Sequence, residues 1–100
     1  VTEVETGTPQ QARPRLLSPR SFTEAKVLAD DYKADVPVVL NLQAVERELA
    51  RRLIDFASGL CYALEGSMEK VAPQVFLLTP RSVEVSDDDR RRLQSHDYRL

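Results

Sequence analysis

The stretch that decides the fold is residues 51–80, which read RRLIDFASGLCYALEGSMEKVAPQVFLLTP. Its first part has apolar residues at spacings of three and four, which predicts the second half of an amphipathic helix. Residues 75–78, VFLL, are all apolar, which predicts a strand that needs cover on both faces. So short a chain is expected to cover one face of its sheet with its own helices, leaving the other face for a partner or a second copy.

Two strands and a helix are predicted before this stretch. Residues 15–17 predict a short edge strand. The spacing of Ser21 and Glu24 is typical of a capping box, which predicts a helix that begins there. Residues 36–42, VPVVLNL, are β-branched and almost wholly apolar, which predicts a buried central strand. The long helix is expected at residues 45–64, where apolar side chains fill about half of the helical wheel.

The rest of the chain predicts strands followed by a closing helix. Residues 67–71 and 75–79 form a hairpin-like pair, and residues 83–85 follow as a short edge strand. Ser86 is expected to cap a peripheral helix at residues 87–97. This order predicts an α+β two-layer sandwich, with a mixed sheet of about four to five strands, two main helices on one face and an extra C-terminal helix.

Residues 1–15 hold no Leu, Ile, Phe, Met or Tyr. Such a segment cannot bury enough surface to offset the entropy of ordering, so we expect a disordered linker remnant. The Val at position 1 suggests a piece excised from a longer chain. The folded core is then expected at residues 16–100, and a core of this modest size indicates support from self-association.

Composition excludes several classes of function. The chain has 14 basic and 16 acidic side chains, so no basic stripe predicts nucleic-acid binding. No apolar run is long enough to span a membrane, and no secretory signal is visible. Cys61 is the single cysteine, which predicts no disulfide framework and no metal cluster and fits a cytoplasmic protein.

No catalytic constellation is apparent either. His96 lies in the weakly anchored tail, and Cys61 lies on the apolar half of the long helix, where a buried structural thiol is the favoured interpretation. The glycines at positions 7, 59 and 66 are too far apart for a phosphate-binding loop. We therefore expect no enzyme and no cofactor.

An interaction module remains. Phe76 and Leu78 share one face of a strand, and Met68 and Lys70 share one face of the preceding strand. Such a surface suits a short peptide that is both acidic and apolar. Periodicity alone slightly favours the simpler interpretation that Phe76 is core, because strand faces cannot be assigned without the register.

Gly59 is unusual within the long helix, where glycine costs about 1 kcal/mol relative to alanine. One interpretation is tolerated drift. The other is that the missing side chain lets a second helix approach closely. Because Gly59 lies on the solvent half of the wheel, with Asp55 and Tyr62 nearby, that second helix would belong to another subunit and the three residues would mediate self-association.

About 70 residues, from 16 to 86, resemble the core of SepF, a bacterial cell-division family. The resemblance depends on three motifs in order and at family spacing: VVLNL at 38–42, DFASG at 55–59 and VFLLTP at 75–80. The turn at 72–74 departs from the pattern, since it reads Ala-Pro-Gln where many members have Gly and Asn.

The resemblance implies a non-enzymatic adaptor that binds the C-terminal peptide of the tubulin-like protein FtsZ. In the full-length protein an N-terminal amphipathic helix, absent from this chain, would tether FtsZ filaments to the inner face of the membrane at the division septum. The resemblance implies a peptide pocket around Lys70 and Phe76, with Met68 and Leu78 as further candidates. It also implies dimers that can polymerise, with Gly59 at a helix-mediated contact.

An alternative of another class is a small dimeric α+β regulatory domain that binds a metabolite. Such a site should show several convergent polar groups near a loop, and the sequence offers few of them. A small molecule that copurifies with the chain or shifts its melting temperature would favour this alternative.

Overall fold

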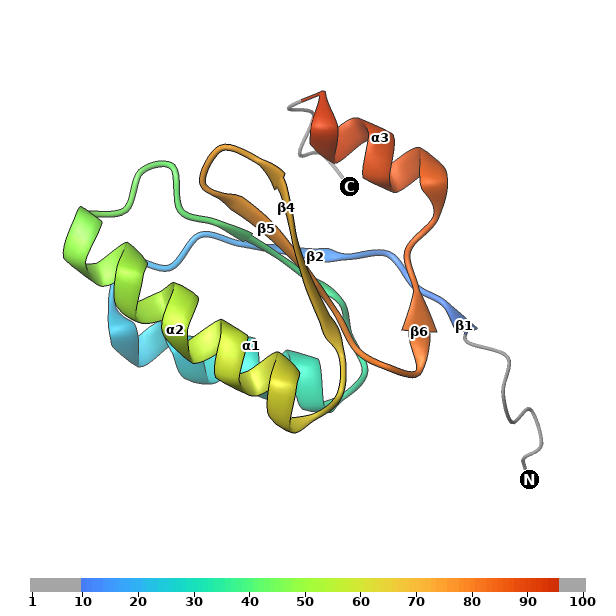
Figure 1. The fold of residues 1–100 in the computed structure, drawn as a ribbon, viewed down its shortest axis with the longest axis horizontal. Coiled ribbons are helices and arrows are strands. Elements are labelled where there is room, and N and C mark those ends of the chain that lie inside the picture. Colours follow the sequence, from blue (N-terminus) through green and yellow to red (C-terminus); the bar gives the residue numbers. More distant parts are fainter. Residues whose placement is uncertain (1–9, 96–100) are drawn as a thin grey trace.

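The computed structural model describes residues 10–95 of the chain (Figure 1). Residues 1–9 and 96–100 lie outside the described part, and with them most of the predicted linker, His96 and the predicted end of the closing helix. The described elements follow in chain order: β1 Gln10–Gln11, β2 Arg15–Leu17, a 3-10 turn η1 Phe22–Glu24, α1 Ala25–Lys33, β3 Val38–Asn41, α2 Arg47–Ala63, β4 Ser67–Ala72, β5 Val75–Thr79, β6 Val83–Glu84 and α3 Asp87–Gln94.

The main sheet has four strands in the order β2-β3-β5-β4. The pair β2–β3 is parallel, while β3–β5 and β5–β4 are antiparallel, so the sheet is mixed, as predicted. The helices α1 and α2 lie together on one face (Figure 1), which confirms the α+β class. The predicted edge strand at residues 83–85 is present as β6, but it pairs with β1 in a separate two-stranded sheet.

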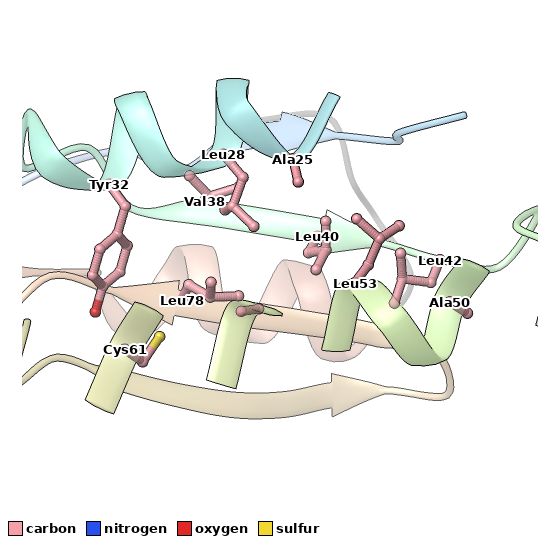
Figure 2. Packing of buried hydrophobic residues seen from close by; sticks show 11 residues of the cluster. Ala25, Leu28, Tyr32, Val38, Leu40, Leu42, Ala50, Leu53, Cys61 and Leu78 are labelled. Atoms are coloured by element: carbon pink, nitrogen blue, oxygen red, sulfur yellow. The ribbon is translucent and has the colours of Figure 1, made fainter. Parts of the chain in front are cut away.

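The face of the sheet beneath α1 and α2 carries the larger core. Figure 2 shows side chains of both helices meeting those of β3 and β5 in one layer. Sequence patterning accounts for this layer, because alternate residues of a strand point to the same face and residues three and four apart share a helix face. The buried members are Ala25, Leu28, Tyr32, Val38, Leu40, Leu42, Ala50, Leu53, Ala57, Cys61 and Leu78.

The opposite face of the sheet carries a second core, which corrects the expectation that this chain leaves that face uncovered. Leu93 of α3 and Val85 are buried in one cluster with residues of the sheet, and Arg90 of α3 forms an ion pair with Glu69 of β4. The sheet residues of this cluster are Val39, Val71, Ala72, Val75 and Leu77. The closing helix therefore supplies the cover that the apolar strand 75–78 requires.

The helix ends differ in part from the predicted caps. Ser21 makes no side-chain cap, and the Glu24 carboxylate instead accepts from the backbone N–H of Arg20 at 3.0 Å, because the helix opens with a 3-10 turn. In α2 the Glu46 side chain accepts from the N–H groups of the first turn. The predicted cap of α3 is confirmed, since the Ser86 hydroxyl accepts from the Asp89 N–H at 3.1 Å.

Residues 10–15 lie within the described part of the chain, where backbone hydrogen bonds connect them to other segments. Gln10 and Gln11 pair with β6, and the N–H of Ala12 donates to the carbonyl of Glu84 at 3.0 Å. Backbone hydrogen bonds hold this segment, and they need no large apolar side chains.

Candidate functional site

The hairpin of β4 and β5 brings the four predicted peptide-binding residues onto one face of the sheet. Met68 pairs with Leu78, and Lys70 pairs with Phe76. Residues directly opposite each other in an antiparallel pair point to the same face. Leu78 belongs to the core beneath the helices, so all four side chains lie on the side of the sheet that α1 and α2 cover.

The four residues differ in how far solvent reaches them. Leu78 is fully buried, so it lies in the core and not on an accessible surface. Met68 and Phe76 are half-buried and pack against the core cluster. Lys70 is exposed. Phe76 therefore packs against the core and is also partly exposed to solvent. A role in the core and a role in peptide binding do not exclude each other.

Charge is divided between the two faces of β4. Glu69 points to the face that α3 covers, where it pairs with Arg90. Lys70 points to the helix face and has no ion pair within the described part of the chain. The Lys70–Phe76 surface, which we define as these two residues with the adjacent Met68, thus combines one unpaired cation with half-buried apolar side chains.

The hairpin turn holds this surface in register. Pro73 and Gln74 connect the strands, and Gln74 has a positive φ of 60°, as position three of a type II turn requires. The register shifts by one residue between Lys70 and Ala72. This bulge turns Val71 and Ala72 toward the second core while leaving Lys70 opposite Phe76.

The three predicted self-association residues lie along one exposed side of α2. Asp55, Gly59 and Tyr62 are spaced by four and three residues and are all exposed. Tyr62 is 86% exposed, the highest value among the large hydrophobic residues within the range 10–95. A Cβ built on Gly59 would meet no atom within 4 Å. Packing among the described residues therefore gives no reason for a glycine there.

A hollow of about 600 Å³ lies beside the start of α2, and it is the place to consider for a metabolite. Its polar lining includes Asn41 and Glu46. The side-chain Oδ1 of Asn41 accepts from the Gln43 N–H at 3.0 Å, and the Glu46 carboxylate caps α2. These two groups are engaged in local structure, and the lining also includes the polar residues Ser18, Arg20 and Gln43. Neither Lys70 nor Phe76 lines this hollow.

Cys61 and Tyr32 lie at one end of the main core (Figure 2). The Tyr32 hydroxyl donates to the carbonyl of Thr79 at 3.0 Å. Burial raises the pKa of the Tyr32 hydroxyl and the pKa of the Cys61 thiol, so both groups stay neutral near pH 7. A neutral, enclosed thiol is a poor nucleophile, which agrees with a structural role.

Residues 10–95 offer neither a metal site nor a membrane-spanning helix. No group of three or more His, Cys, Asp or Glu side chains there is arranged to hold a metal ion. No helix in the same range has the length and apolar character that crossing a bilayer requires.

Fold and surface together define a small α+β domain whose candidate site is an interaction surface beside an edge strand. Comparison with known proteins makes the assignment specific. The family model described as "Cell division protein SepF" matches residues 15–85, and this chain belongs to the SepF family.

Curated relatives agree with this assignment. A cell division protein SepF of Rubrobacter xylanophilus is 52% identical over 81 residues, which are 81% of this chain and 44% of that protein. The SepF of Saccharopolyspora erythraea is 48% identical over 77% of this chain and 36% of its own length. One from a Mycobacterium species is 42% identical over 89% of this chain and 40% of its own. The chain thus spans less than half the length of these relatives.

Proposed function

We propose that this chain is the non-enzymatic adaptor domain of a cell-division protein and that it binds the C-terminal peptide of FtsZ. The observation that carries the proposal is the register of the hairpin, which sets exposed Lys70 directly opposite half-buried Phe76. Membership in the SepF family supports it, because the resemblance implies an acidic and apolar peptide as the partner.

The two residues contribute unequally. Completing the burial of an aromatic side chain such as Phe76 contributes up to about 1.5–3 kcal/mol. An exposed ion pair of Lys70 with a peptide carboxylate contributes about 0–1 kcal/mol. Phe76 is therefore the anchor, and Lys70 selects for acidic sequences and speeds association. So small a surface favours weak, reversible binding of each tail, which suits attachment to many tails of one filament.

The chain self-associates through the exposed side of α2 in this proposal. Gly59 supports it, because the missing side chain gives no packing advantage within the chain but lets two helices approach closely. A homodimer would present two Lys70–Phe76 surfaces. In the full-length protein an N-terminal amphipathic helix, outside this chain, would hold the dimer on the inner face of the membrane at the septum.

Co-sedimentation with FtsZ filaments tests the proposal. We expect the chain to pellet with filaments of full-length FtsZ and to stay in the supernatant with filaments that lack the C-terminal peptide. Phe76→Ala should abolish pelleting, whereas Val27→Ala, at a 40% exposed position of α1, should not. Equal pelleting with tailless filaments would contradict the proposal.

A further inference from the structure

We propose that the bound peptide lies extended along the outer edge of β4 and adds a fifth strand to the main sheet. This inference rests on the proposed function, since the added strand would lie beside Met68 and Lys70. A long apolar side chain of the peptide would then reach across β4 toward Phe76, which pairs with Lys70. It is suggested by three features of β4: an open edge, an alternation of side chains along that edge, and a bulge that ends it.

The outer edge of β4 offers backbone hydrogen bonds. β4 is the last strand in the order β2-β3-β5-β4, and every second residue of such a strand directs its N–H and C=O away from its neighbour. Within residues 10–95, Arg90 of α3 donates to the Glu69 side chain of β4, and the Cys61 thiol of α2 donates to the Ser67 carbonyl at 3.5 Å. An extended segment can bind such an edge by β-augmentation.

The side chains beside the edge specify the sequence of the added segment. On the helix side Met68 is half-buried and Lys70 is exposed, two residues apart. On the other side Glu69 is already paired with Arg90. An added strand alternates in the same way, so its helix-side positions would carry an apolar residue beside Met68 and an acidic residue beside Lys70. The chemistry selects a peptide with an acidic and an apolar residue separated by one position.

The bulge between Lys70 and Ala72 limits the length of the added strand. Both Val71 and Ala72 turn to the second core there, which interrupts the alternation of the edge and increases its twist. The regular edge is therefore Ser67–Lys70, which is long enough for a short segment. A short, bulged edge carrying a lysine also resists pairing with other long strands, which favours a selected peptide over a second copy.

A backbone N-methyl scan of the FtsZ C-terminal peptide tests this geometry. Each backbone amide in turn is methylated, and the affinity of the chain for each peptide is measured by calorimetry. Strand addition predicts losses of about tenfold or more at alternate positions of a three- or four-residue segment, with smaller losses between them, because only alternate N–H groups face β4.

Hydrogen exchange of the chain gives the complementary readout. With peptide bound, alternate amides of β4 should exchange at least tenfold more slowly, while the amide of Leu16 in β2, at the opposite edge, should not change. If the unmodified peptide binds and neither alternation is seen, the strand model is overturned and the adaptor function stands. If the unmodified peptide does not bind, both fall. Protection of β4 without peptide that grows with protein concentration would overturn the model in favour of pairing between copies.

Discussion

Gly66 illustrates how one residue depends on a distant side chain. A Cβ at this position would lie 1.6 Å from the Tyr32 hydroxyl oxygen and 2.6 Å from the Thr79 carbonyl oxygen, and those two atoms are hydrogen-bonded to each other. The left-handed residue that ends α2 is its neighbour Glu65, with a φ of 61°. Gly66 is therefore required for space and not for a positive φ.

Gly66→Ala should lower the free energy of unfolding by about 1–3 kcal/mol, since the added methyl group overpacks a buried site. Gly59→Ala is the matched control, because its Cβ meets open space and alanine is favoured in a helix by about 1 kcal/mol. Urea denaturation at low protein concentration measures both changes. Tyr32→Phe should partly rescue Gly66→Ala. A stability for Gly66→Ala at or above that of the original chain would contradict the close packing of the Tyr32 hydroxyl against Gly66.

Sequence reasoning identifies Gly59 but misses the role of Gly66. Gly59 interrupts a regular helix pattern, and the local sequence alone is enough to recognise this. Gly66 lies where a turn glycine is expected, and its partner Tyr32 lies on another helix that only the fold brings near. The pairing of Lys70 with Phe76 likewise depends on the register, which the apolar pattern of the two strands leaves open.

The helix α3 shows the same limit for a whole element. Its start and its Ser86 cap follow from the sequence and are confirmed. Its docking against the sheet does not follow from the sequence, because the segment has too few apolar residues to predict a buried face. Within α3, Leu93 is fully buried and Asp89 is buried, and the Arg90 ion pair with Glu69 adds a further contact with the sheet.

Leu93→Ala should cost about 2–5 kcal/mol of unfolding free energy, the usual range for a buried leucine, and should loosen α3 first. Gln94→Ala, at an exposed neighbouring position, should change stability by less than about 0.5 kcal/mol. Limited trypsin digestion at Arg90, Arg91 and Arg92 reports the docking of the helix. Unchanged stability and unchanged digestion in Leu93→Ala would contradict the second core.

At the scale of the whole molecule, the open question is how copies associate. Gly59→Lys places a long charged side chain in the space where we propose that a second helix approaches, so the measured mass should fall toward that of the monomer. Size-exclusion chromatography with light scattering measures the change. Val27→Lys, on an exposed position of α1, is the control. A dimer that survives Gly59→Lys would remove α2 from the interface.

The stability of the whole domain should also depend on pH in the alkaline range. The pKa values of Tyr32 and Cys61 are both raised by burial, so the folded state favours their neutral forms. Their contribution is complete below the ordinary thiol value of 9.0 and is lost as pH rises past 9 and 10, where the unfolded chain ionises first. The melting temperature should fall from pH 9 to pH 11, and less steeply in Tyr32→Phe than in the original chain. An equal slope in both would contradict the buried, neutral hydroxyl.

The layered architecture was predictable because periodicity in residues 22–80 determines which faces are apolar, and the family resemblance supplied the site. Two features required the structure: the cover of the second face by α3, and the separate pairing of β1 with β6. Both depend on contacts between segments far apart in the chain. Backbone groups make the contacts between β1 and β6, and Leu93 contributes the buried apolar side chain of α3.

The central claim is that the Lys70–Phe76 surface binds the FtsZ C-terminal peptide. Calorimetric titration with the native and a scrambled peptide tests it most directly, using the original chain, Lys70→Glu and Phe76→Ala. We predict saturable binding of the native peptide only, at least tenfold weakened in Phe76→Ala and also weakened in Lys70→Glu, with Lys70→Glu melting at the original temperature. Equal affinity for both peptides, or unchanged affinity in both variants, would contradict the claim.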